Sequence, residues 1–186
     1  MKLFALEHSK AAYRADFALY GAAVVVLGAL LFWHYPAGRA GQLVAFMLLG
    51  LGSWTALEYV LHRFVLHGVA PFQRWHAEHH ARPTALIGTP TILSATLFGM
   101  LVFLPAVLAG NLWRASALTL GLLLGYLLYA TTHHAIHHWH GESKWLRQRK
   151  RWHAHHHRNT EPLCYGVTSS FWDRIFGSSR RVAGQT

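Results

Sequence analysis

Four apolar stretches dominate the pattern of hydrophobic and polar positions along the chain. They cover about residues 17–34, 42–62, 91–108 and 115–133. Each is long enough for an α-helix, which rises about 1.5 Å per residue, to cross the hydrocarbon layer of a membrane. Residues 139–186 contain no further stretch of that length. The pattern predicts an all-α integral membrane protein of one domain, 1–186, in which four transmembrane helices carry a helical C-terminal cap at 139–186.

Histidines interrupt this pattern near the ends of the apolar stretches. The segment 75–80 reads Trp-His-Ala-Glu-His-His, so that His76, His79 and His80 leave one face of a helix within a single turn. The same spacing returns at His153, His156 and His157. Two copies of a three-imidazole face predict two halves of one metal site.

The composition supports a membrane protein and singles out histidine. The 186 residues are 53% hydrophobic and only 13% charged, and that charged share is about half the usual one for globular proteins. Of the 16 His residues, all but His8 and His34 lie within 62–80 or 133–157. The one Cys, Cys164, excludes an internal disulfide and a thiolate metal cluster.

The distribution of positive charge predicts the orientation in the membrane. With four spans, both termini and every clustered His lie on one side, and all 17 Lys and Arg residues except Arg39 and Arg114 lie there too. The positive-inside rule therefore places the His face and both termini in the cytoplasm, with the C-terminal cap. Because this topology accounts for the net charge of +10, we expect no nucleic-acid partner.

Ten imidazoles are expected to converge on the predicted cytoplasmic side. They belong to four groups along the chain: His62 and His67; His76, His79 and His80; His133 and His137; His153, His156 and His157. Ten neutral imidazoles suit a pair of borderline divalent ions, each with an open position. Iron is the functional candidate, because zinc has no redox chemistry and ten ligands exceed what a structural zinc needs.

Helical geometry refines what the second span contributes. His62 and His67 are five residues apart, which is about 140° around an α-helix, so we expect them to serve different metals or to straddle a helix end. Glu58 lies four residues before His62 on the same helical face and is a candidate to hold the His62 ring. The alternative is an interfacial carboxylate that pairs with Arg63.

Three other kinds of metal protein fit the pattern less well. Haem between transmembrane helices takes its axial His ligands from single positions and would leave most of the ten His residues unexplained. A zinc protease needs His-Glu-x-x-His, but Ala77 and Glu78 put the carboxylate in the wrong place. A metal transporter would hold its sites near mid-membrane between inverted repeats, whereas these His residues gather at one interface.

The histidine spacing and one C-terminal motif resemble those of a known family. His-x4-His at 62–67, His-x2-His-His at 76–80, His-x3-His-His at 133–138 and His-x2-His-His at 153–157 resemble the histidine boxes of the fatty acid hydroxylase/sterol desaturase superfamily. Residues 166–177, Gly-Val-Thr-Ser-Ser-Phe-Trp-Asp-Arg-Ile-Phe-Gly, resemble the segment that follows the last box in fatty acid 2-hydroxylases.

The resemblance implies a membrane-bound, non-haem diiron oxygenase. Two ferrous ions would activate O2, the oxidised centre would abstract hydrogen from a lipid acyl chain, and hydroxyl would return to the carbon, as in 2-hydroxylation of a fatty acid or a ceramide-type lipid. The ten His residues would be the ligands, with zinc able to replace iron in isolated protein. Glu58, His138 and Trp172 would support the site, and His134, His140 and His155 would be supporting or surface residues.

The resemblance also implies partners and leaves two alternatives. The lipid would enter from the bilayer, and electrons would come from a separate donor of the cytochrome b5 or ferredoxin type, because the chain shows no fused cytochrome b5 segment. One alternative is a carotenoid β-ring hydroxylase, whose first boxes resemble residues 58–80, although the third-box spacing and the motif at 168–173 favour acyl chains. The other is a non-enzymatic His-rich metal-binding membrane protein without O2-dependent turnover.

Overall fold

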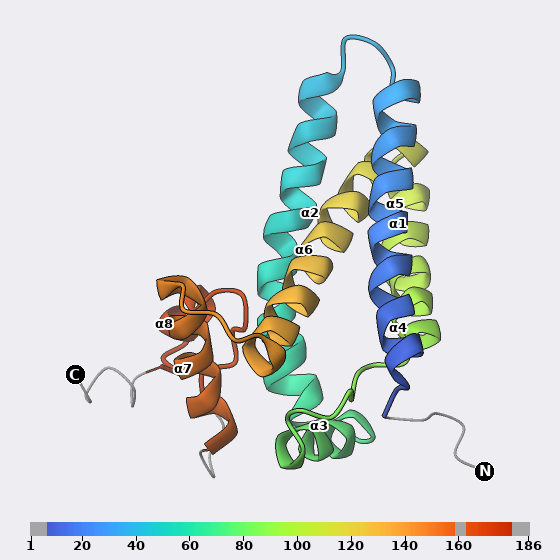
Figure 1. Cartoon of the computed structure of the whole chain (residues 1–186). Coiled ribbons are helices and arrows are strands. Elements are labelled where there is room, and N and C mark those ends of the chain that lie inside the picture. The colour runs from blue at the N-terminus through green and yellow to red at the C-terminus, as the bar shows by residue number, and fades with distance from the viewer. Residues whose placement is uncertain (1–6, 159–162, 180–186) are drawn as a thin grey trace. The chain divides into compact units, whose positions relative to one another are not determined.

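The computed structural model describes residues 7–158 and 163–179. Within these residues every regular element is a helix, apart from an isolated β-bridge between Glu7 and Ile87. The elements in chain order are α1 Lys10–His34, α2 Ala40–Val60, η1 Leu61–Leu66, α3 Phe72–Ala81, α4 Thr91–Leu97, η2 Phe98–Phe103, α5 Leu104–Ala109, α6 Leu112–His138, α7 Lys144–Arg158 and α8 Phe171–Ile175. Figure 1 labels the α-helices among them. The elements η1 and η2 are π-helical. The predicted all-α fold is confirmed.

Four helical stretches are long and apolar enough to cross a membrane. They are Lys10–His34, Ala40–Leu66, Thr91–Ala109 and Leu112–His138. This agrees with the prediction of four membrane-crossing helices. The second stretch consists of α2 and η1, and the third of α4, η2 and α5.

Contacts divide the chain into two compact units. The first comprises Met1–Trp54 and Leu86–Leu127, and the second Thr55–Ala85 and Leu128–Thr186. All ten candidate ligands fall in the second unit. The organisation of the chain as one domain stays a prediction.

Polar side chains begin three of the helices in the way their sequences suggest. Ser9 Oγ accepts a hydrogen bond from the Ala12 amide at 3.2 Å before α1, and Asn111 Oδ1 accepts one from the Arg114 amide at 3.0 Å at the start of α6. Ser143 Oγ does the same for the Leu146 amide at 3.2 Å before α7. Such caps satisfy amides that have no carbonyl partner in the first turn.

Glycines allow α2 and α6 to approach closely in the first unit. A Cβ added to Gly50 would lie 2.1 Å from the Leu118 carbonyl oxygen, and one added to Gly121 would lie 2.0 Å from that of Met47. Lipid offers little hydrophobic driving force between membrane helices, so close backbone packing of small residues stabilises such pairs.

Polar and aromatic contacts join α1 to α4 in the same unit. Thr91 Oγ1 donates to Asp16 Oδ1 at 2.6 Å, and the hydroxyls of Tyr20 and Ser94 lie 2.6 Å apart. The Tyr20 ring also packs on Tyr126, with ring centroids 4.7 Å apart. The two hydrogen bonds give hydroxyl and carboxyl groups in apolar helices the partners that burial requires.

In the second unit, α7 presents one buried face and one charged face. Its buried residues are Leu146, Arg149, His153 and His156, spaced three or four apart as on one side of an α-helix. The exposed residues on the remaining surface include Lys144, Arg147 and Arg151. This amphipathic pattern orients two of the candidate ligands into the unit.

Candidate metal centre

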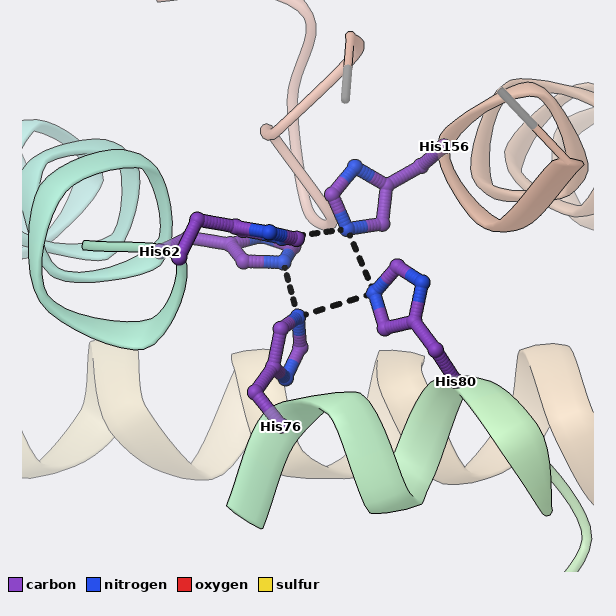
Figure 2. Close-up of side chains that lie close together, drawn as sticks. His62, His76, His80 and His156 are labelled. Atoms are coloured by element: carbon purple, nitrogen blue, oxygen red, sulfur yellow. Dashed lines mark hydrogen bonds between the residues drawn. The ribbon is translucent and has the colours of Figure 1, made fainter. Parts of the chain in front are cut away.

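Five imidazoles meet in a first histidine group. It consists of His62, His67, His76, His80 and His156, each offering one ring nitrogen within 4.8 Å of the others. Figure 2 shows four of these side chains pointing toward one another from η1, α3 and α7. His62 and His156 are 2% and 0% exposed, so the group includes side chains fully removed from solvent.

The π-helical turn explains how His62 and His67 join the same group. His62 lies in η1 and His67 is its C-terminal cap residue. A π-helix bonds residues five apart, so it brings i and i+5 to one side, where an α-helix would separate them. The expectation that they straddle a helix end is what the structure has, and the two rings lie in one group, while the metal that each ring serves stays a prediction.

A second histidine group forms beside α6 and α7. It consists of His79, His133, His137 and His153, whose candidate ligand atoms also lie within 4.8 Å of one another. The tenth predicted residue, His157, lies outside both groups by this measure. Its Nε2 atom is nevertheless 3.0 Å from that of His153, and its ring stacks on His80 with centroids 4.2 Å apart.

The nitrogen–nitrogen distances suit metal coordination. The Nε2 atoms lie 3.0 Å apart in the pairs His62–His76, His76–His80 and His137–His153, and 3.1 Å apart in His80–His156 and His67–His156. Ligands about 2.1 Å from one metal ion are about 3.0 Å apart when the angle at the metal is 90°, and about 3.4 Å apart in a tetrahedron. The observed spacing is that of neighbouring ligands at about 90° around one metal ion.

Two backbone carbonyls determine which ring nitrogen of His62 and of His156 carries the proton. His62 Nδ1 lies 2.5 Å from the Tyr165 carbonyl oxygen, and His156 Nδ1 lies 2.8 Å from that of Leu163. A carbonyl only accepts, so in each neutral ring Nδ1 must donate and Nε2 must carry the free lone pair. The lone pair on Nε2 of each ring is then free to bind a metal ion held by the first histidine group.

Burial keeps the imidazoles outside the membrane-spanning helices neutral. Burial, and then the neighbouring His80, lower the pKa of His67 to about 4. Burial and adjacent imidazoles, His137 first among them, lower the pKa of His79 to about 2. The pKa of His153 is also far below its usual range because the ring is buried among other imidazoles. Neutral rings at physiological pH are the form that binds metal.

Unsatisfied nitrogens complete the fit to a metal. Among the described residues, neither ring nitrogen of His79 has a hydrogen-bond partner, although both atoms are buried. Buried polar atoms normally have partners. The donor set, all imidazole nitrogen, is one that iron, zinc and other borderline divalent ions accept.

The prediction that Glu58 holds the His62 ring is wrong. Its Oε1 atom accepts from the amides of Val167 and Thr168 at 2.7 and 2.9 Å, and its Oε2 accepts from the Thr168 hydroxyl. The ring is held by the Tyr165 carbonyl instead. The alternative pairing with Arg63 is also wrong, because that guanidinium donates to the Tyr59 hydroxyl at 2.5 Å. The buried Glu58 carboxylate is therefore held by two consecutive backbone amides and a hydroxyl, and not by His62 or Arg63.

Trp172 and His138, the other two residues predicted to support the site, each contact a neighbouring side chain. Trp172 Nε1 donates to Thr55 Oγ1 at 3.1 Å, and the Trp172 ring stacks on Phe176. His138 stacks on His134 with centroids 4.6 Å apart. A supporting role for Trp172 or His138 stays a prediction. Neither these residues nor His140 and His155 belong to the two histidine groups.

Asp173 is a residue of the site that the sequence reasoning did not single out. It is 0% exposed and accepts hydrogen bonds from the amides of Tyr165 and Gly166, each at 2.8 Å. The available signal was a lone carboxylate within the apolar run Phe-Trp-Asp-Arg-Ile-Phe, since a buried Asp requires partners. The Leu163 and Tyr165 carbonyls carry no such signal, because every residue has one.

The fold and the two histidine groups define a class of membrane-embedded, histidine-rich proteins that could hold metal ions, and comparison with known proteins identifies the family. Residues 47–178 match the sequence model of the fatty acid hydroxylase family. The chain belongs to that family, as the resemblance predicted. Its four apolar helices and its membership of this family identify it as an integral membrane protein.

Named relatives act on lipids. The chain is 35% identical over 156 residues to a dihydroceramide fatty acyl 2-hydroxylase of Arabidopsis thaliana, covering 75% of this chain and 61% of that one. It is 31% identical over 148 residues to the ceramide very long chain fatty acid hydroxylase of Schizosaccharomyces pombe, covering 73% and 42%. Thus the chain spans less than two thirds of the length of these relatives.

A solved structure shares the fold. It is described as full length scs7p with only the hydroxylase domain visible, and it superposes with a TM-score of 0.77 at 25% identity. The match covers 90% of this chain and 66% of that one. The likeness extends over nearly all of the helical architecture and agrees with the family assignment.

Proposed function

We propose that this protein is a membrane-bound hydroxylase that replaces a C–H bond by C–OH in the acyl chain of a fatty acid or ceramide-type lipid, at position 2. The main observation behind this proposal is that a chain of the fatty acid hydroxylase family brings nine imidazoles together in two histidine groups. The relatives named as acyl 2-hydroxylases support the substrate class and the position. They do not favour the carotenoid alternative.

Each histidine group would hold one metal ion. The first group supplies five imidazoles and the second four, with His157 available beside His153. Iron suits the proposed reaction because the same imidazole set binds it and zinc lacks redox chemistry. Two iron ions would supply the redox chemistry through which O2 oxidises an unactivated C–H bond.

The protein's own residues would orient and protect this chemistry. The Tyr165 and Leu163 carbonyls hold His62 and His156 with Nε2 unprotonated, so these rings need not lose a proton when a metal binds. The burial of His62, His79, His153 and His156 would keep water from these four rings. The apolar spans would let the acyl chain approach from the bilayer.

Partners and orientation follow from the reaction and the charge distribution. Hydroxylation by O2 consumes two electrons and two protons in addition to the C–H bond, and yields the alcohol and water. We propose a separate electron donor of the cytochrome b5 or ferredoxin type. The excess of Lys and Arg on the side of the His residues supports a cytoplasmic metal centre and cytoplasmic termini.

Mass spectrometry of total lipids tests the proposed function. Cells would express the wild type, His76→Ala, or His140→Ala as a matched control, because His140 is exposed and outside both groups. We expect 2-hydroxylated acyl chains with the wild type and the control but not with His76→Ala. A hydroxylated carotenoid in a pigment-producing host would replace the proposal by its alternative. Absence of any hydroxylated lipid, with an electron donor co-expressed, would indicate a non-enzymatic metal-binding protein.

A further inference from the structure

Two buried carboxylates hold one backbone segment, residues 163–168, next to the metal centre. Asp173 Oδ1 accepts from the Tyr165 amide and Oδ2 from the Gly166 amide, each at 2.8 Å. Glu58 Oε1 accepts from the next two amides, those of Val167 and Thr168. Four consecutive N–H groups therefore donate to two carboxylates that are 0% and 5% exposed.

The same segment orients two ligands of the first histidine group. The peptide group between Tyr165 and Gly166 donates its N–H to Asp173 and offers its C=O to His62 Nδ1. This peptide group thus links a carboxylate directly to a ligand ring. Negative charge at the N–H end polarises the peptide and makes its carbonyl a stronger acceptor for the ring proton.

Asp173 reaches the second ligand ring by a longer route. Ser178 Oγ donates to Asp173 Oδ1 at 2.7 Å, and the Ser178 carbonyl accepts from the Cys164 amide at 3.2 Å. The carbonyl on the other side of that peptide bond, Leu163, accepts from His156 Nδ1 at 2.8 Å. Both carbonyls that orient ligand rings therefore depend on the position of Asp173.

A buried arginine offsets the charge of the two carboxylates. Arg149 is 5% exposed and attracts both Glu58 and Asp173. It lies on the buried face of α7, four residues before His153. Ionised carboxylates are stable in such surroundings only when amides and a countercharge replace water.

We propose that Asp173 and Glu58 are positioning residues of the metal centre, which hold segment 163–168 so that its carbonyls fix the orientation of His62 and His156 and keep the ring proton on Nδ1. The inference rests on the proposed metal centre, but it does not depend on which lipid is hydroxylated. Neither carboxylate is assigned as a ligand.

The hydrogen-bond pattern predicts different outcomes for two isosteric substitutions. In Glu58→Gln the amide oxygen can still accept from both backbone amides, and its NH2 can donate to the Thr168 hydroxyl. In Asp173→Asn each oxygen position faces a backbone N–H, so the new NH2 must meet a donor. If the carboxylates acted on the metal through charge alone, the two substitutions would have equal effects.

The test measures metal affinity on the full chain purified in detergent. Zn²⁺ affinity is obtained by competition with a chromogenic chelator, and the visible absorption of bound Co²⁺ reports the ligand geometry. We expect Asp173→Asn to lower affinity by about tenfold or more and to change the Co²⁺ spectrum, as loss of supporting residues around metal ligands does. Glu58→Gln should stay within about threefold of wild type, whereas Glu58→Ala should lose about tenfold. Exposed Glu142→Gln is the matched control.

Several outcomes would overturn the proposal. The first is an Asp173→Asn variant with the metal affinity and Co²⁺ spectrum of the wild type. The second is an equal loss of metal affinity in Asp173→Asn and Glu58→Gln. The third is wild-type metal affinity in Glu58→Ala. If Asp173→Asn does not fold, the Glu58→Gln and Glu58→Ala pair still decides the question. Because no lipid enters the assay, a failure to hydroxylate lipid in cells would overturn the proposed function and leave this result intact.

Discussion

The Nε2 atoms of His80 and His156 lie 3.1 Å apart, although the two residues are separated by 76 positions in the chain. One ring comes from α3 and the other from α7, so this contact depends on how the two helices fold together. A metal ion between the rings would turn this close approach into a stabilising contact.

Ligand substitutions should remove metals selectively. His156→Ala is expected to lower bound metal from about two ions per chain to about one, since it truncates only the first histidine group. His153→Ala should also leave about one ion per chain, because it truncates only the second histidine group. Elemental analysis of purified protein measures this, with His155→Ala as the control on the same helix. Unchanged metal content in His156→Ala would contradict the assignment of ligands.

Metal removal should destabilise the protein reversibly. Binding to the folded state alone contributes about 2.7 kcal/mol when free metal exceeds Kd a hundredfold, and each kcal/mol corresponds to about 2–4 °C in a chain of this length. We therefore expect chelation to lower Tm by about 5–10 °C and added Fe²⁺ or Zn²⁺ to restore it. Thermal unfolding in detergent, before and after dialysis against a chelator, is the measurement. An unchanged Tm in protein shown to be metal-free would count against metal ions that couple α3, α6 and α7.

Close packing of α2 and α6 should make one glycine sensitive and its neighbour tolerant. Gly50→Ala places a Cβ 2.1 Å from the Leu118 carbonyl oxygen, so the helices must separate. We expect a loss of about 1–3 kcal/mol in unfolding free energy. Gly52→Ala meets nothing within 4 Å and should be neutral, or stabilising by up to about 1 kcal/mol through helix propensity. Denaturation of both variants in mixed detergent compares them, and equal effects would refute the packing argument.

Local patterns in the sequence account for the elements and for most of the candidate ligands. Apolar runs predict the spans because crossing a bilayer requires length and hydropathy alone. The spacing of His76, His79 and His80 predicts a shared face because helical geometry is local. The family resemblance then supplied the chemistry that such a cluster performs.

The remaining features depend on contacts that no local pattern records. The π-helical turn after Val60 put His62 and His67 in one group, and nothing in Leu-His-Arg-Phe-Val-Leu distinguishes it from an α-helical turn. Glu58 found its partner 109 positions away, so its helical neighbour His62 was the wrong expectation. Backbone carbonyls hold the ligand rings, and their positions follow only from the folded loop.

Cys164 should be unreactive in the native protein and should report on the loop that holds the ligands. Its thiol is fully buried, and burial, together with nearby Asp173, raises its pKa to about 12. A raised pKa means that the reactive thiolate is scarce at pH 8, so the native protein should react with iodoacetamide far more slowly than the denatured protein does. Because the chain has one Cys, mass spectrometry of the labelled protein follows this site alone. Asp173→Asn, which frees segment 163–168, should label faster than wild type, whereas Glu142→Gln should not. Rapid labelling of the folded, metal-loaded wild type would show that the segment opens readily, and would contradict its role in holding His62 and His156.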